Sequence, residues 1–387
     1  NYFLTFLGTV ILVPLAEECF FRGLIFRNLY KQSHWAAYLV SIAAFACIHI
    51  LGYIGQYSAK ELLIAIVQYV PAGLWLAWSY IKGESIFVSC GVEEANPFLL
   101  SRDFVMETRF RFPVETMEDV LRRAARMFFA RKGTIVDVVA GFPWFGRWGR
   151  DTFISLPGLC LAIDDWRMFK MAIEGELTDF RDGFFPNIGT GNQSAYNSVD
   201  APLWFFWCIQ QYAYINNART EVWNLYSKVM KQILDTFAEG TDNVRMDSNY
   251  LLWQSQSGKA LTWMDAIVDG VPVTPRNGYA VEINALWYNA VMFYRELAEL
   301  ACSDGESAKW DEFASVFPSS FKSTFWSKEK GYLADCVNGA EKDFSVRCNM
   351  IFAVSMPYTC LSLKIRQLIV EKVKQELLTP YGLRSLS

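Results

Sequence analysis

From Met117 onward, apolar residues recur at intervals of three and four positions, which is the period of an amphipathic α-helix. Strand signals are sparse in this part of the chain. The segments between the apolar stripes are long, rich in Gly, Pro, Asn and Trp, and carry the densest polar clusters. Helices in sequential pairs with elaborated loops on one side predict an all-α domain of the α/α toroid type rather than a four-helix bundle. The predicted helices cover residues 117–131, 152–177 with a break near Asp164, 199–215, 220–239, 280–302, 307–327, 346–357 and 361–377.

The first ninety residues follow a different pattern, with long apolar runs and few charges. Apolar stretches cover residues 2–16, 35–55 and 62–81, and the last two approach the roughly 20 residues that a helix needs to cross a bilayer. The pattern therefore predicts about three transmembrane helices and contact with a membrane through residues 1–82.

Basic residues flank these stretches unequally. The loop near residues 56–61 carries only Lys60, whereas the other side carries Arg22, Arg27, Lys31 and Lys82. The positive-inside rule then places the remainder of the chain in the cytoplasm, tethered to a membrane if the first ninety residues belong with it.

Composition and charge narrow the class of protein. The 387 residues are 52% hydrophobic and 16% aromatic, which is enough apolar material for two domains. The change in pattern predicts a membrane-embedded fragment over residues 1–90, a junction over 91–116 and a second domain over 117–387. A net charge of -4 gives no electrostatic reason to expect nucleic acid as a partner. Nine cysteines without a Cys-x-x-Cys pair predict free buried thiols in a reducing compartment.

A group of charged residues interrupts the apolar pattern near the amino terminus. Glu17, Glu18 and Arg22 lie in helix-compatible apolar surroundings, where adjacent carboxylates are costly unless they bind something. His49 follows Phe45 by four positions, so both lie on one helical face. The motifs Glu-Glu-x-x-x-Arg and Phe-x-x-x-His resemble those of CaaX-type intramembrane metalloproteases over about 90 residues. The resemblance implies that Glu and His residues hold a metal, with zinc as the candidate, or activate water.

The second histidine of that family has no counterpart in this sequence. His34 lies in a loop between the predicted spans, and a catalytic metal site usually has three protein ligands. We therefore assign no metal ligand. Two interpretations stay open: a metalloprotease, and a non-catalytic remnant in which Glu17, Glu18 and Arg22 pair internally.

Three loops of the second domain carry candidate chemistry, and the first is AGFPWFGRWGRD at residues 140–151. Arg150 and Asp151 lie at the start of a predicted helix, where a guanidinium and a carboxylate can hydrogen-bond to neighbouring hydroxyl groups. Trp144, Phe145 and Trp148 offer flat apolar faces for a sugar ring. The alternative is a structural Arg–Asp pair with core aromatics.

The second loop is GFFPNIGTGNQSAYNSVDAPLWF, at residues 183–205, and it carries no plausible phosphate-binding lysine. Polar groups of this kind suit a neutral hydroxylated ligand. Alternatively, the last of these groups is the N-cap of a helix that begins at Ala201. The polar residues of this loop are Asn187, Asn192, Tyr196, Asn197 and Asp200.

The third loop is LTWMDAIVDGVPVTPRNGYAVEINALWYN, at residues 261–289. Asp265 follows Trp263 and Met264, and such an apolar setting favours the protonated form of a carboxyl group, as a proton donor requires. Asp269, Arg276 and Glu282 follow. Glu282 begins a predicted helix, so ligand binding and a favourable interaction with the helix dipole are both open.

Together, in this order and spacing, AGFPWFGRWGRD, YNSVDAPLWF and TWMDA…TPRNGYAVEINALWYN resemble the glucosidase domain of glycogen debranching enzymes, which is related to glucoamylases. The resemblance covers about residues 117–387 and implies an (α/α)6 barrel. It also implies inverting hydrolysis of α-1,6-linked glucose at branch points of glycogen or another branched α-glucan, without a cofactor. By the same resemblance, Asp265 is the general acid, and Arg150 and Asp151 hold the terminal glucose. The other candidate substrate contacts are Trp144, Trp148, Asn197, Asp200, Trp263, Arg276 and Glu282.

An inverting glycosidase also needs a second carboxylate as base, roughly 6.5–9.5 Å from the acid. The resemblance places this base after the segment Thr-Pro-x-Gly-Leu-Arg-Ser-Leu, which occupies residues 379–386 here. We therefore expect the base and the closing helices of the barrel to be missing from this chain. Asp269 and Glu282 are the alternatives within it.

Three functions stay open on the sequence alone. The leading one is a glycoside hydrolase of the debranching type, and the second is the membrane metalloprotease. The third is a membrane-tethered glucan-binding module without catalysis. The abrupt change near residues 90–94, without a Pro/Gly/Ser linker, suggests that two gene pieces have been joined.

Overall fold

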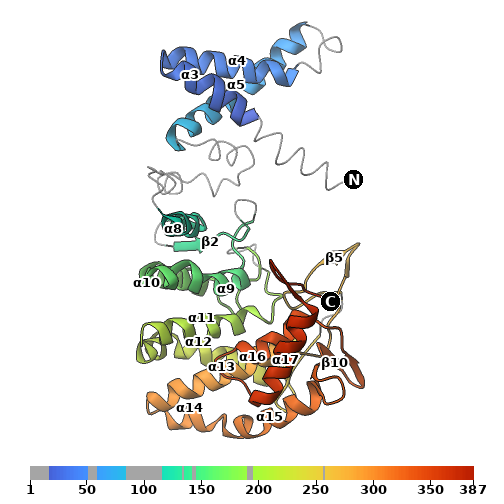
Figure 1. Ribbon diagram of the computed structural model, residues 1–387. Helices are drawn as coiled ribbons and strands as arrows, with labels where there is room; N and C mark the ends of the chain where they lie inside the picture. Colours follow the sequence, from blue (N-terminus) through green and yellow to red (C-terminus); the bar gives the residue numbers. More distant parts are fainter. Residues whose placement is uncertain are drawn as a thin grey trace. The chain divides into compact units, whose positions relative to one another are not determined.

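The computed structural model describes residues 17–50, 59–83, 116–132, 135–141, 145–189, 195–255 and 258–387. The chain divides into two compact units, Asn1–Phe145 and Gly146–Ser387, and each is described by itself. The described residues of both units are mostly helical (Figure 1), which confirms the all-α class.

The first unit contains a small helical cluster. α4 packs along α5, and a π-helix, η2, packs on α4. Phe21, Phe45 and Leu76 form an apolar core between these three helices. In chain order, its helices are η2 (Cys19–Phe26), α3 (Arg27–Tyr30), α4 (His34–Ile50) and α5 (Ala59–Gly83).

The prediction of three transmembrane helices is not supported. Among the described residues, no helix combines the length and the apolar character that are needed to cross a membrane. α4 has 17 residues, and α5 has 25 but includes Glu61, Pro71 and Ser79. The predicted span at residues 2–16 lies outside the described residues.

A helix and a β-hairpin complete the described part of the first unit. α8 (Met117–Met127) starts after Thr116, whose Oγ1 accepts a hydrogen bond from the backbone N–H of Asp119 at 3.1 Å. It ends four residues before the predicted end at residue 131. The chain instead forms β1 (Phe129–Lys132), which pairs antiparallel with β2 (Ile135–Val138), because the β-branched residues of β2 supply a partner strand.

The second unit consists of consecutive helix pairs (Figure 1). α9 packs on α11 and α11 packs on α13, so these three form an inner row, with α10 packed on α9 and α12 packed on α11 and α13. The predicted break near Asp164 is confirmed, because its φ of 60° ends the helical path between α9 and α10. The helices are α9 (Gly149–Cys160), η5 (Leu161–Ile163), α10 (Trp166–Leu177), α11 (Ala201–Ile215), α12 (Arg219–Glu239), α13 (Val281–Leu300), α14 (Asp304–Ala308), α15 (Asp311–Phe325), η7 (Cys348–Ile351), α16 (Phe352–Ser355) and α17 (Leu363–Glu376).

Burial distinguishes the inner from the outer helices. Most residues of α11 and α13 are buried on every side, whereas α12 buries one stripe. A single apolar stripe is typical of a helix with one solvent-facing side. α15 also buries a single stripe, which consists of phenylalanines at every fourth position, each in contact with the next. The α12 stripe is Val222, Tyr226, Met230, Ile233, Leu234 and Phe237.

Short antiparallel strands lie in the connections between the helices and after α17, and they are more numerous than the sparse strand signals predicted. Most span only two or three residues, which is too short to give a clear alternating pattern in the sequence. The pairs are β3 (Val244–Met246) with β4 (Leu252–Gln254), β5 (Ile267–Val268) with β6 (Val271–Pro272), β8 (Trp326–Ser327) with β9 (Tyr332–Leu333), β12 (Leu378–Thr379) with β13 (Gly382–Leu383), and β10 (Cys336–Asn338) between β7 (Tyr279–Ala280) and β11 (Glu341–Asp343).

The eight described cysteines are free, as predicted, but they are not all buried. Cys160, Cys208 and Cys336 are buried, whereas Cys19, Cys47 and Cys302 are exposed. Burial raises the pKa of the Cys160 and Cys336 thiols, the latter to about 12.

Candidate active site

The candidate site is built at the amino ends of the inner helices. Each inner helix is followed by an outer partner that returns the chain, so the long connections gather at one end of the unit (Figure 1). This topology brings the three predicted loops together. Arg150 lies in the first turn of α9, Asp200 precedes α11, and Glu282 lies in the first turn of α13.

Arg150 and Asp200 form a buried ion pair. The Arg150 Nε lies 2.7 Å from the Asp200 Oδ2, and Nη2 donates to the Ser198 Oγ at 3.4 Å. Ser198 in turn donates to the Asp200 Oδ1. Burial alone would lower the pKa of Arg150, but the carboxylates of Asp200 and Asp265 outweigh it and raise the pKa. Arg150 is therefore a fixed positive charge.

The side chain of Asp200 does not cap α11, although Asp200 occupies the N-cap position. Its oxygens are taken by Arg150 and Ser198, and Ser198 Oγ accepts from the backbone N–H of Ala201 at 3.3 Å. The capping alternative is therefore wrong for the Asp200 side chain.

Arg150 also reaches Asp265, where Nη1 lies 3.0 Å from Oδ2. The Asp265 side chain is 34% exposed, whereas that of Asp200 is 1% exposed. The apolar setting expected for Asp265 is therefore wrong, because its immediate neighbour is a guanidinium and one side faces outward. One cation thus links a buried carboxylate to an accessible one.

Asp151 is exposed next to this pair. Desolvation by the surrounding protein raises the pKa of Asp151, and the carboxylates of Asp200 and Asp265 act in the same direction while Arg150 opposes them. The site therefore presents accessible carboxyl groups from two different loops.

Gly149 allows the second loop to approach the start of α9. A Cβ at this position would clash with the backbone oxygen of Pro186, and the Gly149 N–H donates to the Asn187 carbonyl at 3.3 Å. The glycine before Arg150 therefore fixes the position of Arg150 relative to the loop that carries Asp200.

In the described residues of the loop at 183–205, two acceptor atoms have no hydrogen-bond donor. They are the side-chain oxygens of Asn187 and Asn197, and both atoms are buried. Buried polar atoms in native proteins are nearly always paired with protein or with water. These oxygens are suited to a molecule that supplies hydroxyl donors.

Arg276 and Glu282 form a second buried cluster. Arg276 Nη2 donates to Glu282 Oε2 at 2.7 Å, Nη1 donates to Oε1, and Nε lies 2.8 Å from Asp335 Oδ2. Further bonds reach the Asp335 carbonyl and the Thr262 hydroxyl, so all five N–H groups of the guanidinium have acceptors. Glu282 is 1% exposed. The substrate contacts predicted for Arg276 and Glu282 stay predictions, and the structure gives these residues a buried ion pair.

Asn349 connects this cluster to the segment that carries Asp265. Its amide donates to Asp335 Oδ1 at 2.8 Å, and its carbonyl oxygen accepts from the indole N–H of Trp263 at 2.8 Å. It also contacts the Met264 sulfur at 3.3 Å. Asn349 is fully buried and therefore holds the two residues that precede Asp265.

Asp335, Asn349 and Ser198 are site residues that the sequence did not predict. Asp335 lies within the apolar run Tyr-Leu-Ala-Asp-Cys-Val, and a lone carboxylate in such a run is a signal that a buried partner is needed. Burial raises the pKa of Asp335 to about 6, Glu282 acts in the same direction and Arg276 opposes them.

The remaining predicted site residues differ in exposure. Trp148 and Trp263 are half-buried, and Phe145 is exposed. Asp269 is exposed in the turn between β5 and β6, with a φ of 50°. Trp144 and Asn192 lie outside the described residues.

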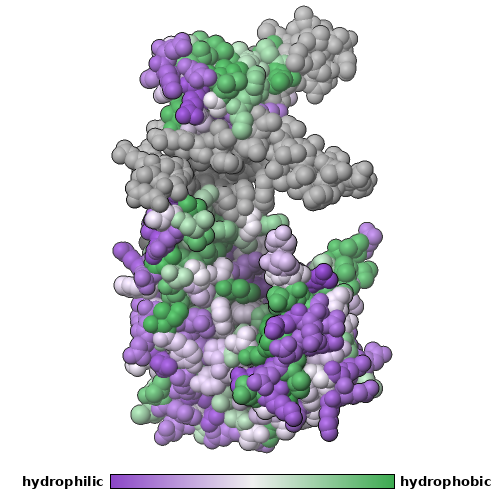
Figure 2. Space-filling model, viewed as in Figure 1, coloured by the Kyte–Doolittle hydropathy of each residue, from purple (hydrophilic) through white to green (hydrophobic). Residues whose placement is uncertain are grey.

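The β5–β6 hairpin that follows Asp265 has an apolar tip. Ile267, Val268, Val271 and Val273 are each more than half exposed. Figure 2 shows this tip as a hydrophobic patch over β5. An exposed aliphatic surface thus begins two residues after Asp265 in the chain.

In the first unit, Glu18 and Arg22 form a buried ion pair with 3.0 Å between Oε1 and Nη1. Arg22 also lies over the Phe45 ring, 4.6 Å from its centroid, and donates to the Gly73 carbonyl at 3.4 Å. This agrees with the internal pairing of Glu18 and Arg22. Within the described part of the chain, no group of three His, Cys, Asp or Glu residues could hold a metal ion. The side chain of His49 lies outside the description, so zinc stays a prediction.

The second unit is thus a helical domain built from helix pairs. Its described loops carry one candidate active site, in which a guanidinium and several carboxyl groups lie together. The sequence model of the family "Amylo-alpha-1,6-glucosidase" matches residues 101–387. The chain belongs to this family. A second model, "Type II CAAX prenyl endopeptidase Rce1-like", matches residues 1–93.

Among known proteins, the chain is similar to the glycogen debranching enzyme of Saccharomyces cerevisiae, with 23% identity over 323 residues. The match covers 64% of this chain and 21% of the yeast protein, so the chain spans about a fifth of that relative. Among solved structures, a GH78 family rhamnosidase of Bacillus sp. GL1 matches with a TM-score of 0.38 and 16% identity, covering 54% of this chain and 20% of that one.

Proposed function

We propose that the second unit is a glycoside hydrolase of the debranching type, acting on α-1,6-linked glucose in a branched α-glucan with inversion. Asp265 is the general acid in this proposal, and Arg150 and Asp151 hold the terminal sugar. Membership of the amylo-alpha-1,6-glucosidase family supports the reaction class. The proposal also includes an (α/α)6 barrel, of which the helix pairs α9–α10 and α11–α12 are two hairpins.

The observation that carries the proposal is the bridge from Asp200 through Arg150 to Asp265. A buried Asp200 fixes the guanidinium, and the guanidinium fixes the orientation of the partly exposed Asp265 carboxyl group. A general acid must be held within hydrogen-bond distance of the leaving oxygen, and this bridge provides such an anchor.

The acid step uses the accessible side of Asp265. Its carboxyl group transfers a proton to the glycosidic oxygen while the bond between that oxygen and the anomeric carbon breaks. Water adds to the anomeric carbon from the opposite face and gives its proton to a second carboxylate. We assign no residue to this second role. Arg150 also donates to Asp265 and so holds this carboxyl group in place.

The polar groups of the site favour a neutral, hydroxyl-rich ligand. The buried side-chain oxygens of Asn187 and Asn197 need donors, and the carboxyl groups of Asp151 and Asp265 accept hydrogen bonds. Sugar hydroxyls donate to such acceptors, whereas a phosphate would place negative charge beside them. No cofactor is part of this proposal.

The test is the release of glucose from panose, a trisaccharide with one α-1,6 linkage, by the full chain. Proton NMR distinguishes the anomers of the freshly released sugar. We expect β-glucose first, because inversion of an α-linkage gives the β-anomer. First release of the α-anomer, or cleavage of only the α-1,4 linkage, would contradict the proposal.

A further inference from the structure

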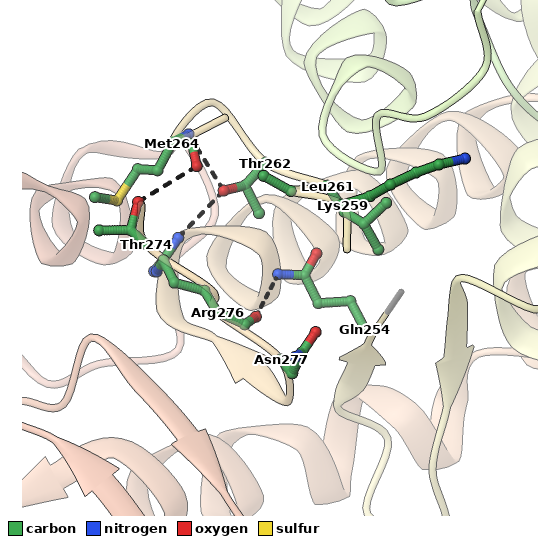
Figure 3. Close-up of a pocket in the computed structure, with 9 residues that line it drawn as sticks. Gln254, Lys259, Leu261, Thr262, Met264, Thr274, Arg276 and Asn277 are labelled. Atoms are coloured by element: carbon green, nitrogen blue, oxygen red, sulfur yellow. Dashed lines mark hydrogen bonds between the residues drawn. The ribbon is translucent and has the colours of Figure 1, made fainter. Parts of the chain in front are cut away.

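A small polar pocket lies beside the segment that carries Asp265 (Figure 3). Its cavity of about 10 Å³ is comparable to the space that one water molecule needs. No sugar ring fits such a volume, but a single hydroxyl group does. The lining residues are Gln254, Lys259, Ala260, Leu261, Thr262, Met264, Thr274, Arg276 and Asn277.

Gln254 is fixed in this pocket by its backbone and its amide. It ends β4, and its backbone exchanges two hydrogen bonds with Gly278, at 3.0 and 2.7 Å. Gly278 has a φ of 115°, and a Cβ there would clash with the Val337 oxygen, so only glycine allows this approach. The Gln254 side chain donates from Nε2 to the Arg276 carbonyl at 3.1 Å. The opposite orientation would place Oε1 against that carbonyl, where two acceptors would repel. The hydrogen bond therefore determines the positions of Nε2 and Oε1.

The Gln254 Oε1 atom is then a buried acceptor without a donor among the described residues. Gln254 is 2% exposed, so bulk water does not satisfy this oxygen. In Figure 3, the Oε1 end of the amide points away from the Arg276 carbonyl and towards Leu261. An acceptor in this position requires an O–H or N–H group, and no side chain in the described part of the chain donates one to it.

The charges around the pocket exclude an anion. The five N–H groups of Arg276 are all used by Glu282, Asp335 and Thr262. Lys259 is exposed, and Figure 3 shows it extending away from the Gln254 amide. The pocket therefore offers an acceptor and no unpaired buried cation, which suits a neutral hydroxyl.

We propose that this pocket binds one hydroxyl group that donates a hydrogen bond to Gln254 Oε1. The hydroxyl belongs either to an ordered water molecule or to a sugar unit of a bound glucan that displaces this water. Only the second source rests on the proposed function. Thr262 and Met264 line the pocket and flank Trp263, so an occupant contacts the segment that positions Asp265.

The test is a pair of crystal structures of the full chain, without ligand and with panose, at a resolution that shows ordered water. An oxygen within hydrogen-bond distance of Gln254 Oε1 is expected in the ligand-free crystal. With panose bound, persistence of this oxygen as water identifies a structural water, and replacement by a sugar oxygen identifies a glucan subsite. An empty pocket in crystals with ordered water elsewhere, or an ion in the pocket, would overturn the proposal.

Gln254→Met provides a second measurement, because methionine has a similar length and no acceptor of comparable strength. The oxygen should be absent from its crystals. For the sugar source, the affinity for panose should fall about fivefold, the equivalent of one neutral hydrogen bond. If the occupant is an ordered water molecule, the affinity for panose should be unchanged. If panose binds nowhere while the water is present, the proposed function fails and the hydroxyl site stands.

Discussion

The guanidinium of Arg150 lies 3.0 Å from the carboxyl group of Asp265, although 115 positions separate the two residues in the sequence. The same guanidinium lies 2.7 Å from the buried Asp200. A side chain that links three loops in this way determines both the shape of the site and its charge. The first prediction therefore concerns Arg150.

Replacing Arg150 with Lys should remove the link. A lysine ammonium can pair with one carboxylate but lacks the planar fork that reaches both Asp200 and Asp265. We expect the affinity for panose to fall at least about tenfold, or about 1.4 kcal/mol. The free energy of unfolding should fall by about 1–3 kcal/mol, since one buried acceptor loses its partner. Isothermal titration calorimetry and urea unfolding measure the two effects.

Arg295→Lys is the matched control for this change. Arg295 pairs with Glu299 and Asp311 on the surface side of α13, and both partners are more than half exposed. The control should change the unfolding free energy by less than about 1 kcal/mol and leave panose binding unaltered. Equal effects of the two substitutions would contradict the linking role of Arg150.

Asn349 should position the Asp265 segment through its amide. Asn349→Leu removes the bonds to Trp263 and Asp335, whereas Asn349→Asp keeps the size but places a second carboxyl group against Asp335 Oδ1. Two carboxylates in contact repel, and a proton shared between them restores a donor. The thermal midpoint of Asn349→Asp should therefore be lower than that of wild type at pH 8, and this difference should become smaller as the pH falls to 5.

The Asn349→Leu variant is the control, because leucine does not titrate. Its loss of thermal midpoint should not recover at pH 5, and both variants should weaken panose binding at pH 8. A midpoint of Asn349→Asp that is equally low at both pH values would exclude the shared proton. Unaltered panose binding in both variants would leave Asn349 with a structural role only.

Asp335 should make stability depend on pH in a defined direction. Burial raises its pKa to about 6, from an ordinary value near 3.8. The folded protein then binds a proton more tightly than the unfolded chain, so this residue contributes stability below about pH 4 that is lost as the pH rises through about 6. The difference in unfolding free energy between wild type and Asp335→Asn should therefore shift in favour of wild type as the pH falls from 7 to 4. A constant difference, measured by urea unfolding, would contradict this.

The Glu18–Arg22 pair in the first unit should behave as a buried ion pair. Both side chains are fully buried, so Arg22→Met should cost about 3–5 kcal/mol because the buried Glu18 loses this charged partner. Adding Glu18→Gln to the same chain should restore much of the loss. Hydrogen exchange of the backbone amides in residues 19–50 reports on this unit separately.

Arg122→Met is the control, since Arg122 pairs with Glu118 at the same spacing of four residues on an exposed helix face. That pair is worth about 0.3–0.5 kcal/mol. If the double variant were no more stable than Arg22→Met, the buried charge would not be the cause.

The helices of the second unit could be predicted because their apolar stripes are long. The phenylalanines of α15 and the stripe of α12 repeat over several turns, and Asp164 marks the break before α10. The predicted membrane spans show the opposite case. These spans were predicted from the apolar composition of residues 35–55 and 62–81. In the structure, α4 has only 17 residues, and α5 includes Pro71 among its 25 residues.

The site could be predicted only in parts. Arg150, Asp200 and Asp265 each stand in a recognisable motif, and their loops meet because the inner helices start at the same end. Asp335 reaches Arg276 only through the pairing of β10 with β7, where Cys336 lies opposite Ala280. Such two-residue strands have no period that a sequence pattern could reveal, so the buried network around Asn349 could not be predicted.

The central claim is that Asp265 donates the proton in a glucan site held by Arg150. Its most direct test compares the rates of glucose release from panose by the wild-type chain and by Asp265→Asn, with panose affinity measured for both. The account predicts that both proteins bind panose within about threefold and that release by Asp265→Asn is slower by at least about 100-fold, the range for loss of a general acid. Equal rates of release, or no binding of panose by either protein, would contradict it.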